Sequence, residues 1–431
     1  MWSVPGSGRQ AINAPAGGPG GGGVPWVGLG ILFILTLILA AFVAYFYFDV
    51  GKDTDDGGSD GPALVNNGAT GPAGGDLEGS SVGSLGYPAV ATRNTTRISG
   101  SDPTEISVAA VLASYPTVGP GTPPEALTVV NADQWQAGVA AATLSAAPVG
   151  APILLAPSGT LSEGASDALS EFDPQGAPTT GESQIFAVGK VAPPSGYDTN
   201  KINAKDAAGL AVGIAEVKRE LTGEPPAAFV LVSSEESEFA TPAASWVARS
   251  GDVVLYTGKD KIPEATLTYL KKKENKDVPV FVLGPASVVS PTALKALDKV
   301  STVERVGGED PVSAALELVR FSSGTFGWNL NDPGHGYMVV RSDQPMAAIA
   351  ATALSTGGTW PALLLTDDSD KLPEDVGDYL LDVKPGYDTD PTIALYTHVW
   401  IIGDEDQIDV TQQALIDDAV ELTRVETLSA P

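Results

Sequence analysis

The sequence predicts an α/β fold in which three similar parallel-sheet units follow one another along the chain. Two observations lead to this prediction: a six-residue pattern that returns twice at a constant interval, and short apolar strands that alternate with helices. A third observation, one long uncharged apolar segment near the N-terminus, predicts a single membrane-spanning helix before these units.

The repeated pattern starts with a basic residue and ends with an aspartate five positions later. It reads RISGSD at 97–102, KINAKD at 201–206 and RVGGED at 305–310, so the interval is 104 residues both times. A period of about 100 residues is the size of a small domain rather than of a solenoid repeat. We therefore expect three tandem Rossmann-like or flavodoxin-like repeats, at 95–200, 201–304 and 305–431, packed around a pseudo-threefold axis.

The strands and helices of each repeat come in the same order. The first repeat is expected to have strands at 97–98, 127–130, 152–155 and 185–189, with helices that start near Asp102, Trp135 and Leu161. Matching apolar runs lie at 229–232, 253–256, 280–284, 338–340, 361–365 and 399–403. Several of these runs are apolar at every position, which is typical of parallel strands covered on both faces.

The apolar segment Trp26–Phe48 contains 23 residues and no charge. As a helix it is about 34 Å long, enough to cross a hydrocarbon core of about 30 Å. We predict a transmembrane helix at 25–48, which is longer than the apolar region of a cleaved signal peptide. Arg9 before the helix and the aspartates after it favour a disordered cytoplasmic arm at 1–24, with the repeats outside the membrane.

Residues 49–94 are rich in Gly, Asp, Ser and Pro and have few large apolar side chains. Such a segment cannot bury enough apolar surface to fold, so we predict a disordered acidic linker. A flexible chain of about 45 residues reaches roughly 35–40 Å. This distance would hold the repeats away from the membrane.

The charge and the cysteine content exclude several classes of function. The formal net charge is −29, most of it in the repeats, and a surface this acidic repels nucleic acid. The chain has no cysteine and only two histidines, His335 and His398, so thiolate sites and histidine-rich metal sites are disfavoured. We predict neither a cofactor nor a resident metal.

The repeated pattern also supplies the candidate site residues. Asp102, Asp206 and Asp310 have the sequence context of helix N-caps. With the basic residues of the same pattern they are alternatively a ligand site, because parallel sheets bind ligands beyond the carboxyl ends of their strands. The ligand-binding candidates are Arg97, Asp102, Lys201, Asp206, Arg305 and Asp310. Lys271–Lys273 is expected to end a helix, and an anion-binding patch is the alternative there.

Together these features resemble the type 2 cell wall-binding repeat family. The resemblance rests on RISGSD at 97–102, GAPILL at 150–155, the apolar strands that end in glycine, and GPASVVS at 284–290, which is similar to the family's closing G-G-x-x-A-V-S. It implies a Gram-positive surface protein with three copies in a pseudo-trimer. Where the family usually has an aspartate near the start of the second helix, this chain has Ala137, Thr241 and Ala347. The effector domain that such repeats usually anchor is not recognised here.

The sequence therefore predicts a single-pass, membrane-anchored protein that is not an enzyme and binds non-covalently to cell-wall glycopolymer. An anionic polymer would need bridging cations or local basic pockets, because the repeats are acidic. An extracytoplasmic scaffold or sensor for a protein or a small solute is the alternative. A wall hydrolase is less favoured, because no repeat has a distinctive pair of carboxylates.

Overall fold

The computed structural model describes residues 89–115, 122–298 and 300–425, which belong to one compact unit. The predicted cytoplasmic arm, the predicted transmembrane helix and most of the predicted linker lie outside the described residues. Within the described ranges, no helix combines the length and the apolar character that a membrane span needs.

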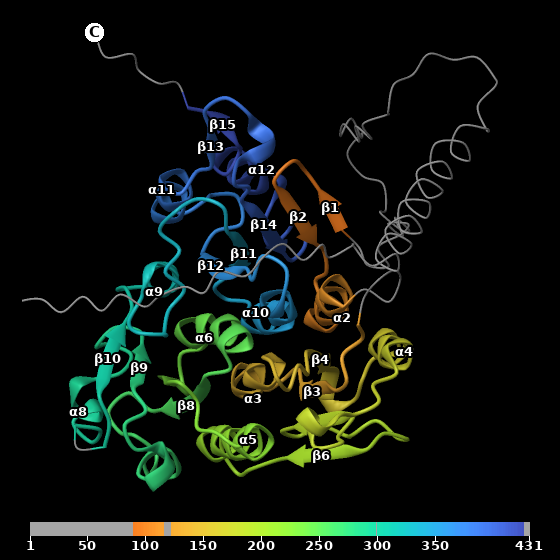
Figure 1. The fold of residues 1–431 in the computed structure, drawn as a ribbon, viewed down its shortest axis with the longest axis vertical. Coiled ribbons are helices and arrows are strands. Elements are labelled where there is room, and N and C mark those ends of the chain that lie inside the picture. The colour runs from red at the N-terminus through yellow and green to blue at the C-terminus, as the bar shows by residue number, and fades with distance from the viewer. Residues whose placement is uncertain (1–88, 116–121, 299, 426–431) are drawn as a thin grey trace, which may run out of the picture. The chain divides into compact units, whose positions relative to one another are not determined.

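The described residues form three mainly parallel sheets and one two-stranded sheet (Figure 1). The first sheet has the order β4-β3-β5-β6, from β3 (Leu127–Asn131), β4 (Ile153–Ala156), β5 (Ile185–Val188) and β6 (Thr199–Ile202). The second has the order β8-β7-β9-β10, from β7 (Phe229–Ser233), β8 (Val253–Thr257), β9 (Val280–Leu283) and β10 (Val303–Val306).

The third sheet has the order β12-β11-β14-β2-β1. Its strands are β11 (Gly336–Arg341), β12 (Ala362–Thr366), β14 (His398–Ile402), β2 (Thr95–Ile98) and β1 (Ala89–Ala91). Strand β1 pairs antiparallel with β2 and covers that edge, and it lies inside the range predicted as linker. The small sheet pairs β13 (Gly386–Tyr387) with β15 (Thr423–Arg424).

Each of the three larger sheets contains strands from two repeats. The opening strand of the second repeat, β6, pairs with β5 of the first, and the opening strand of the third, β10, pairs with β9 of the second. The opening strand of the first repeat, β2, pairs with β14 of the third repeat. The chain therefore closes on itself, and its N-terminal and C-terminal repeats share one sheet.

Helices cover the faces of these sheets, as the predicted alternation of strands and helices requires. They are α2 (Pro103–Ser114), α3 (Trp135–Ala141), α4 (Glu163–Phe172), α5 (Ala207–Thr222), α6 (Ser237–Ser250), α7 (Glu264–Leu270), α8 (Pro291–Leu294), α9 (Pro311–Arg320), α10 (Pro345–Ala350), α11 (Glu374–Asp382) and α12 (Val410–Ala419).

The equivalent helices α3, α6 and α10, one from each repeat, contact one another pairwise. Figure 1 shows them side by side between the sheets. Small residues allow the close approach: Gly138 of α3 lies directly against the Ile349 side chain of α10. These contacts join the three repeats through a continuous apolar core.

Seven strands of the three larger sheets are completely buried, which agrees with their largely apolar sequences. Every residue of β3, β4, β5, β7, β8, β9 and β12 is buried. The prediction of a mixed α/β fold with several parallel-sheet units is confirmed. Most of the predicted strand positions agree with the structure to within about two residues.

Candidate functional site

Arg97, the basic residue of the first repeated pattern, is buried between the first and third repeats. It is only 2% exposed. Its Nε donates to Gln413 Oε1 at 3.0 Å, and its Nη1 donates to the carbonyl oxygens of Gly403 and Asp404, each at 2.9 Å. Burial lowers the pKa of the guanidinium, and nearby carboxylates oppose this shift. These contacts hold β2 to the chain that follows β14.

Arg305 makes a related but more exposed contact. Its guanidinium donates to the carbonyl oxygens of Gly284 and Val289, just after β9. Lys201 is exposed, and no hydrogen bond is found for its side chain among the described residues. The difference has a local cause. A helix follows the closing strand in the second and third repeats, α8 and α12, whereas residues 190–198 of the first repeat form a loop.

Asp102, Asp206 and Asp310 are helix N-caps, as their sequence context predicts. Their carboxylates accept from the backbone N–H groups of Thr104, Gly209 and Ser313 at 2.9, 2.8 and 3.0 Å. The described residues contain no ion pair between these aspartates and the basic residue five positions earlier. A ligand-binding role for the six residues stays a prediction, and an open pocket supports it where the first and second repeats meet.

That pocket lies beyond the carboxyl ends of β5 and β6, where Asp206 caps α5. It has a volume of about 170 Å³. Gln134, Lys190 and Lys205 are among its lining residues. Gln134 Oε1 accepts from the backbone N–H of Lys190 at 2.8 Å, because Gly189 has a φ of 77° and leaves room for the amide. The pocket is small, and it suits a small polar solute better than a polymer chain.

A larger groove lies at the opposite, amino-terminal edge of the second sheet. It has a volume of about 780 Å³ and runs between the turn after α7 and the segment that leads into β10. Its lining includes Lys271, Lys272, Lys273 and Lys276, together with Asp277 and Asp298. We call it the lysine groove. Lys271 follows directly after α7, so the predicted helix end at the lysine run is confirmed.

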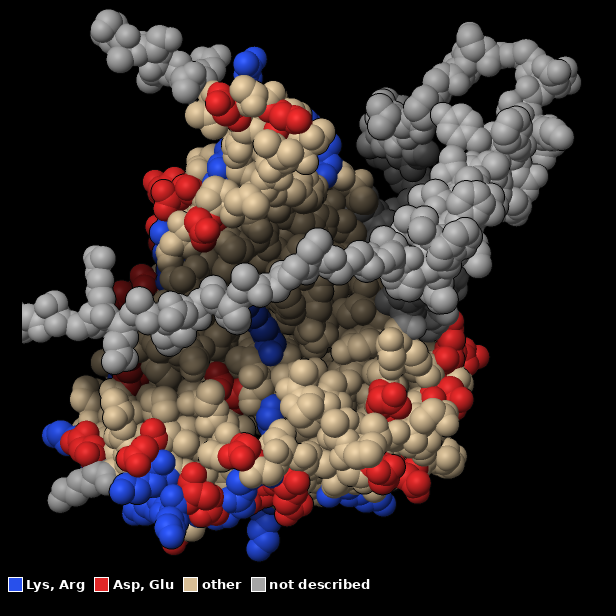
Figure 2. Space-filling view, viewed as in Figure 1, with Lys and Arg blue, Asp and Glu red and all other residues tan. Residues whose placement is uncertain are grey.

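The lysine groove concentrates positive charge in an acidic protein. Eight of the chain's 24 Lys and Arg residues lie between positions 259 and 299, against five Asp and Glu. In Figure 2, blue side chains gather at the lower left of the described surface, near α5 and α8. Red acidic side chains are spread over the rest of the visible face.

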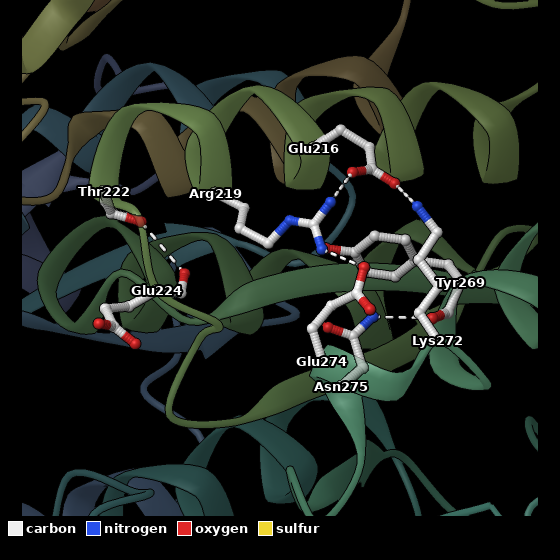
Figure 3. Close-up of polar contacts among 8 residues, drawn as sticks. All are labelled: Glu216, Arg219, Thr222, Glu224, Tyr269, Lys272, Glu274 and Asn275. Atoms are coloured by element: carbon white, nitrogen blue, oxygen red, sulfur yellow. Dashed lines mark hydrogen bonds and ion pairs between the residues drawn. The ribbon is translucent and has the colours of Figure 1, made fainter.

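The acidic side chains next to the groove form an ion-pair network with other basic residues (Figure 3). Glu216 of α5 pairs with Arg219 at 2.6 Å and also with Lys272, and Glu274 pairs with Arg219. Because these acids are already paired, they do not neutralise Lys271, Lys273 and Lys276. These three lysines are exposed, and no ion pair is found for them within the described ranges.

Lys218 lies buried where the first and second repeats meet. It lines a pocket of about 170 Å³, and its Nζ donates to the carbonyl oxygen of Thr143 at 3.2 Å. The Thr143 hydroxyl donates in turn to the carbonyl oxygen of Asp252 at 2.8 Å. Burial lowers the pKa of Lys218 to about 8, and the Asp252 carboxylate partly opposes this shift.

The buried amine of Lys218 makes the stability of the protein change with pH in the alkaline range. Its pKa is about 8 in the folded protein, below the ordinary lysine value, so between these values only the unfolded chain holds the proton. Stability therefore rises with pH above 8. We expect the free energy of unfolding of the natural chain, relative to Lys218→Met, to rise by about 2 kcal/mol between pH 7 and pH 10. Urea unfolding of both chains at several pH values measures it, and parallel pH curves would contradict it.

The histidines and acids of the described residues do not assemble a metal centre. No group of three or more His, Asp or Glu side chains placed to hold a metal ion is found there. His335 contacts Asp332 at 3.1 Å on an exposed loop, and His398 is half-buried at the start of β14.

Solved structures with a similar fold include two cell wall proteins of one bacterium. Cwp6 from Clostridium difficile superposes with a TM-score of 0.60 at 15% sequence identity, over 76% of this chain and 48% of that one. Cwp8 from Clostridium difficile gives a TM-score of 0.59 at 18% identity, over 76% and 52%. This chain thus spans about half the length of each. No family model and no curated protein matches the sequence.

Proposed function

We propose that this chain is an extracytoplasmic, non-catalytic protein that attaches non-covalently to cell-wall glycopolymer through its three repeats, with residues 25–48 as its membrane anchor. The observation that carries the proposal is the fold, which is similar to those of Cwp6 and Cwp8 over three quarters of the chain. The resemblance of the sequence to the type 2 cell wall-binding repeat family supports the same role.

The lysine groove supports an anionic polymer as the ligand. A protein with a net charge of −29 repels polyanions over most of its surface, so contact requires a local region of opposite charge. Lys271, Lys273 and Lys276 provide this region beside an open groove of about 780 Å³. We infer that negatively charged groups of the polymer lie in this groove and that the acidic remainder limits non-specific binding.

The experiment is co-sedimentation of the full chain, kept soluble in mild detergent, with isolated Gram-positive cell walls. Walls stripped of their secondary polymers serve as the control. We expect binding to intact walls, loss of binding to stripped walls, and weakening as salt rises, because exposed charges are screened. Absence of binding to intact walls at low salt would refute the proposed function.

Two triple variants test the groove itself. Lys271→Gln/Lys273→Gln/Lys276→Gln removes its unpaired charges, and Lys259→Gln/Lys261→Gln/Lys371→Gln removes three exposed charges outside the groove lining. We expect the first variant to bind intact walls at least about ten-fold more weakly at low salt, and the second to bind like the natural chain. Equal binding by the two variants would be compatible with the wall-binding role but would show that the polymer does not contact the protein at the lysine groove.

A sensor for a small polar solute is the second candidate. It is favoured by the pocket beside Asp206, whose size and mixed polar lining suit such a ligand. In that case stripped and intact walls would behave alike, and a solute would raise the melting temperature of the natural chain but not of Lys190→Gln/Lys205→Gln.

A further inference from the structure

Arg249 lies between two indole rings where the second and third repeats meet. Its guanidinium carbon is 5.0 Å from the ring centroid of Trp328 and 5.6 Å from that of Trp360. Arg249 is in the last turn of α6, Trp328 follows α9, and Trp360 precedes β12. We call this set the indole clamp.

The guanidinium of Arg249 has no carboxylate partner among the described residues. This is unusual in a chain with 53 Asp and Glu residues. The residue is exposed, and partial desolvation lowers its pKa. A guanidinium stacked on aromatic faces keeps its N–H groups free at the edge, where a carboxylate or phosphate accepts two hydrogen bonds in one plane.

Trp360 is held in a strained and exposed position. The residue is 49% exposed, and its φ is 45°, a left-handed value that bulky residues rarely adopt. Pro361 follows it and restricts this backbone further. Strain of this kind persists where the surrounding structure fixes it and often occurs at binding sites. The exposed indole presents an apolar face to solvent beside an unpaired cation.

Trp328 gives the clamp a rigid base. It is 4% exposed and packs edge-on against Trp246 at a centroid distance of 5.4 Å. Its buried Nε1 finds no hydrogen-bond acceptor among the described residues. The fixed Trp328 ring therefore positions Arg249, and Arg249 in turn contacts the exposed Trp360.

We propose that the indole clamp binds a pyranose ring that carries a negatively charged substituent. The C–H groups of the ring stack on the exposed indole of Trp360, and the carboxylate or phosphate accepts from the edge of the Arg249 guanidinium. This proposal rests on the proposed function, because it adds a saccharide-reading site to a polymer-binding protein. The indole clamp binds a single sugar unit, whereas the lysine groove contacts the negative charges along the polymer.

The test uses the full chain in detergent and three probes: methyl glucoside, methyl glucuronide and glucose 6-phosphate. Saturation-transfer NMR and tryptophan fluorescence report binding. We expect at least one charged sugar to bind with a Kd of roughly millimolar, and the neutral sugar at least about ten-fold more weakly. The two charged probes distinguish a carboxylate-bearing unit from a phosphate-bearing one. Equal binding of all three sugars, or of none, would overturn the proposal.

Variants separate a binding role from a packing role. We expect Arg249→Gln and Trp360→Gly each to weaken charged-sugar binding at least ten-fold, while Arg341→Gln, which removes a half-buried arginine paired with Asp343, has no effect. Trp360→Gly relieves the left-handed strain, so its melting temperature should be equal to or above that of the natural chain. A lower melting temperature with unchanged sugar binding would show that the indole serves packing only.

Failure of this proposal is distinct from failure of the proposed function. A chain that binds walls but none of the sugars refutes the clamp alone. A chain that binds a charged sugar through Arg249 and Trp360 but does not bind walls refutes the wall-binding role and keeps the clamp.

Discussion

Replacing Arg97 with alanine should lower the free energy of unfolding by about 3–5 kcal/mol, the largest effect of any single change that we predict. The guanidinium is buried and donates to three acceptors at the junction of β2 with β14 and α12. Its removal leaves two backbone carbonyl oxygens and the Gln413 amide without these donors. Urea unfolding of the full chain, followed by near-UV circular dichroism, measures the loss.

The other two repeats provide matched controls for this prediction. Lys201→Ala should change stability by less than about 0.5 kcal/mol, because its side chain is exposed. Arg305→Ala should cost about 1–2 kcal/mol, because it donates to two carbonyl oxygens but is partly solvated. Equal losses at the three positions would contradict our assignment of Arg97 to the junction.

Gly138→Val should destabilise the protein by about 3 kcal/mol through overpacking between α3 and α10. A Cβ at this position would lie 2.7 Å from Ile349 Cγ2 and 2.9 Å from Ile349 Cδ1. The strands behind both helices are fully buried, so neither helix has room to move away. Thermal and urea unfolding both report the change.

Two further variants test whether overpacking is the cause, because helix propensity alone favours valine over glycine and would not lower stability. Gly164→Ala in α4 places a methyl group where nothing lies within 4 Å, and should be neutral or stabilising by up to about 1 kcal/mol. Ile349→Ala combined with Gly138→Val should recover part of the loss, because the smaller partner makes space for the new side chain. If the double variant loses at least as much free energy of unfolding as the two single variants together, overpacking is not the cause.

The sequence predicted those features that depend on neighbouring residues. The caps at Asp102, Asp206 and Asp310 and the helix end at Lys271 follow from residues a few positions away, and the structure confirms them. The buried strands were recognisable because a parallel strand covered on both faces is apolar throughout.

Features that depend on distant partners could not be predicted in this way. Arg97, Lys201 and Arg305 hold the same place in the repeat, yet they differ because the segment covering each one differs. The partner of Arg97, Gln413, is 316 residues away, and Lys272 pairs with Glu216 across 56 residues. The indole clamp joins three segments that are far apart in the sequence. Apart from the dipeptide Trp360-Pro361, no local pattern marks them.

The shared third sheet also determines how the molecule resists mechanical force. Suppose that β1 has detached and that a stretching force is applied between residues 95 and 425. The force then acts on the N-terminal end of β2 and on the C-terminal end of β14. Because the two strands are parallel, these forces slide one strand along the other, and all of their hydrogen bonds are loaded together rather than one by one. Arg97 bridges the same two segments and adds to this resistance. A force between the N-terminal segment and the third repeat therefore acts parallel to the two strands. This is the direction in which a paired strand is hardest to detach.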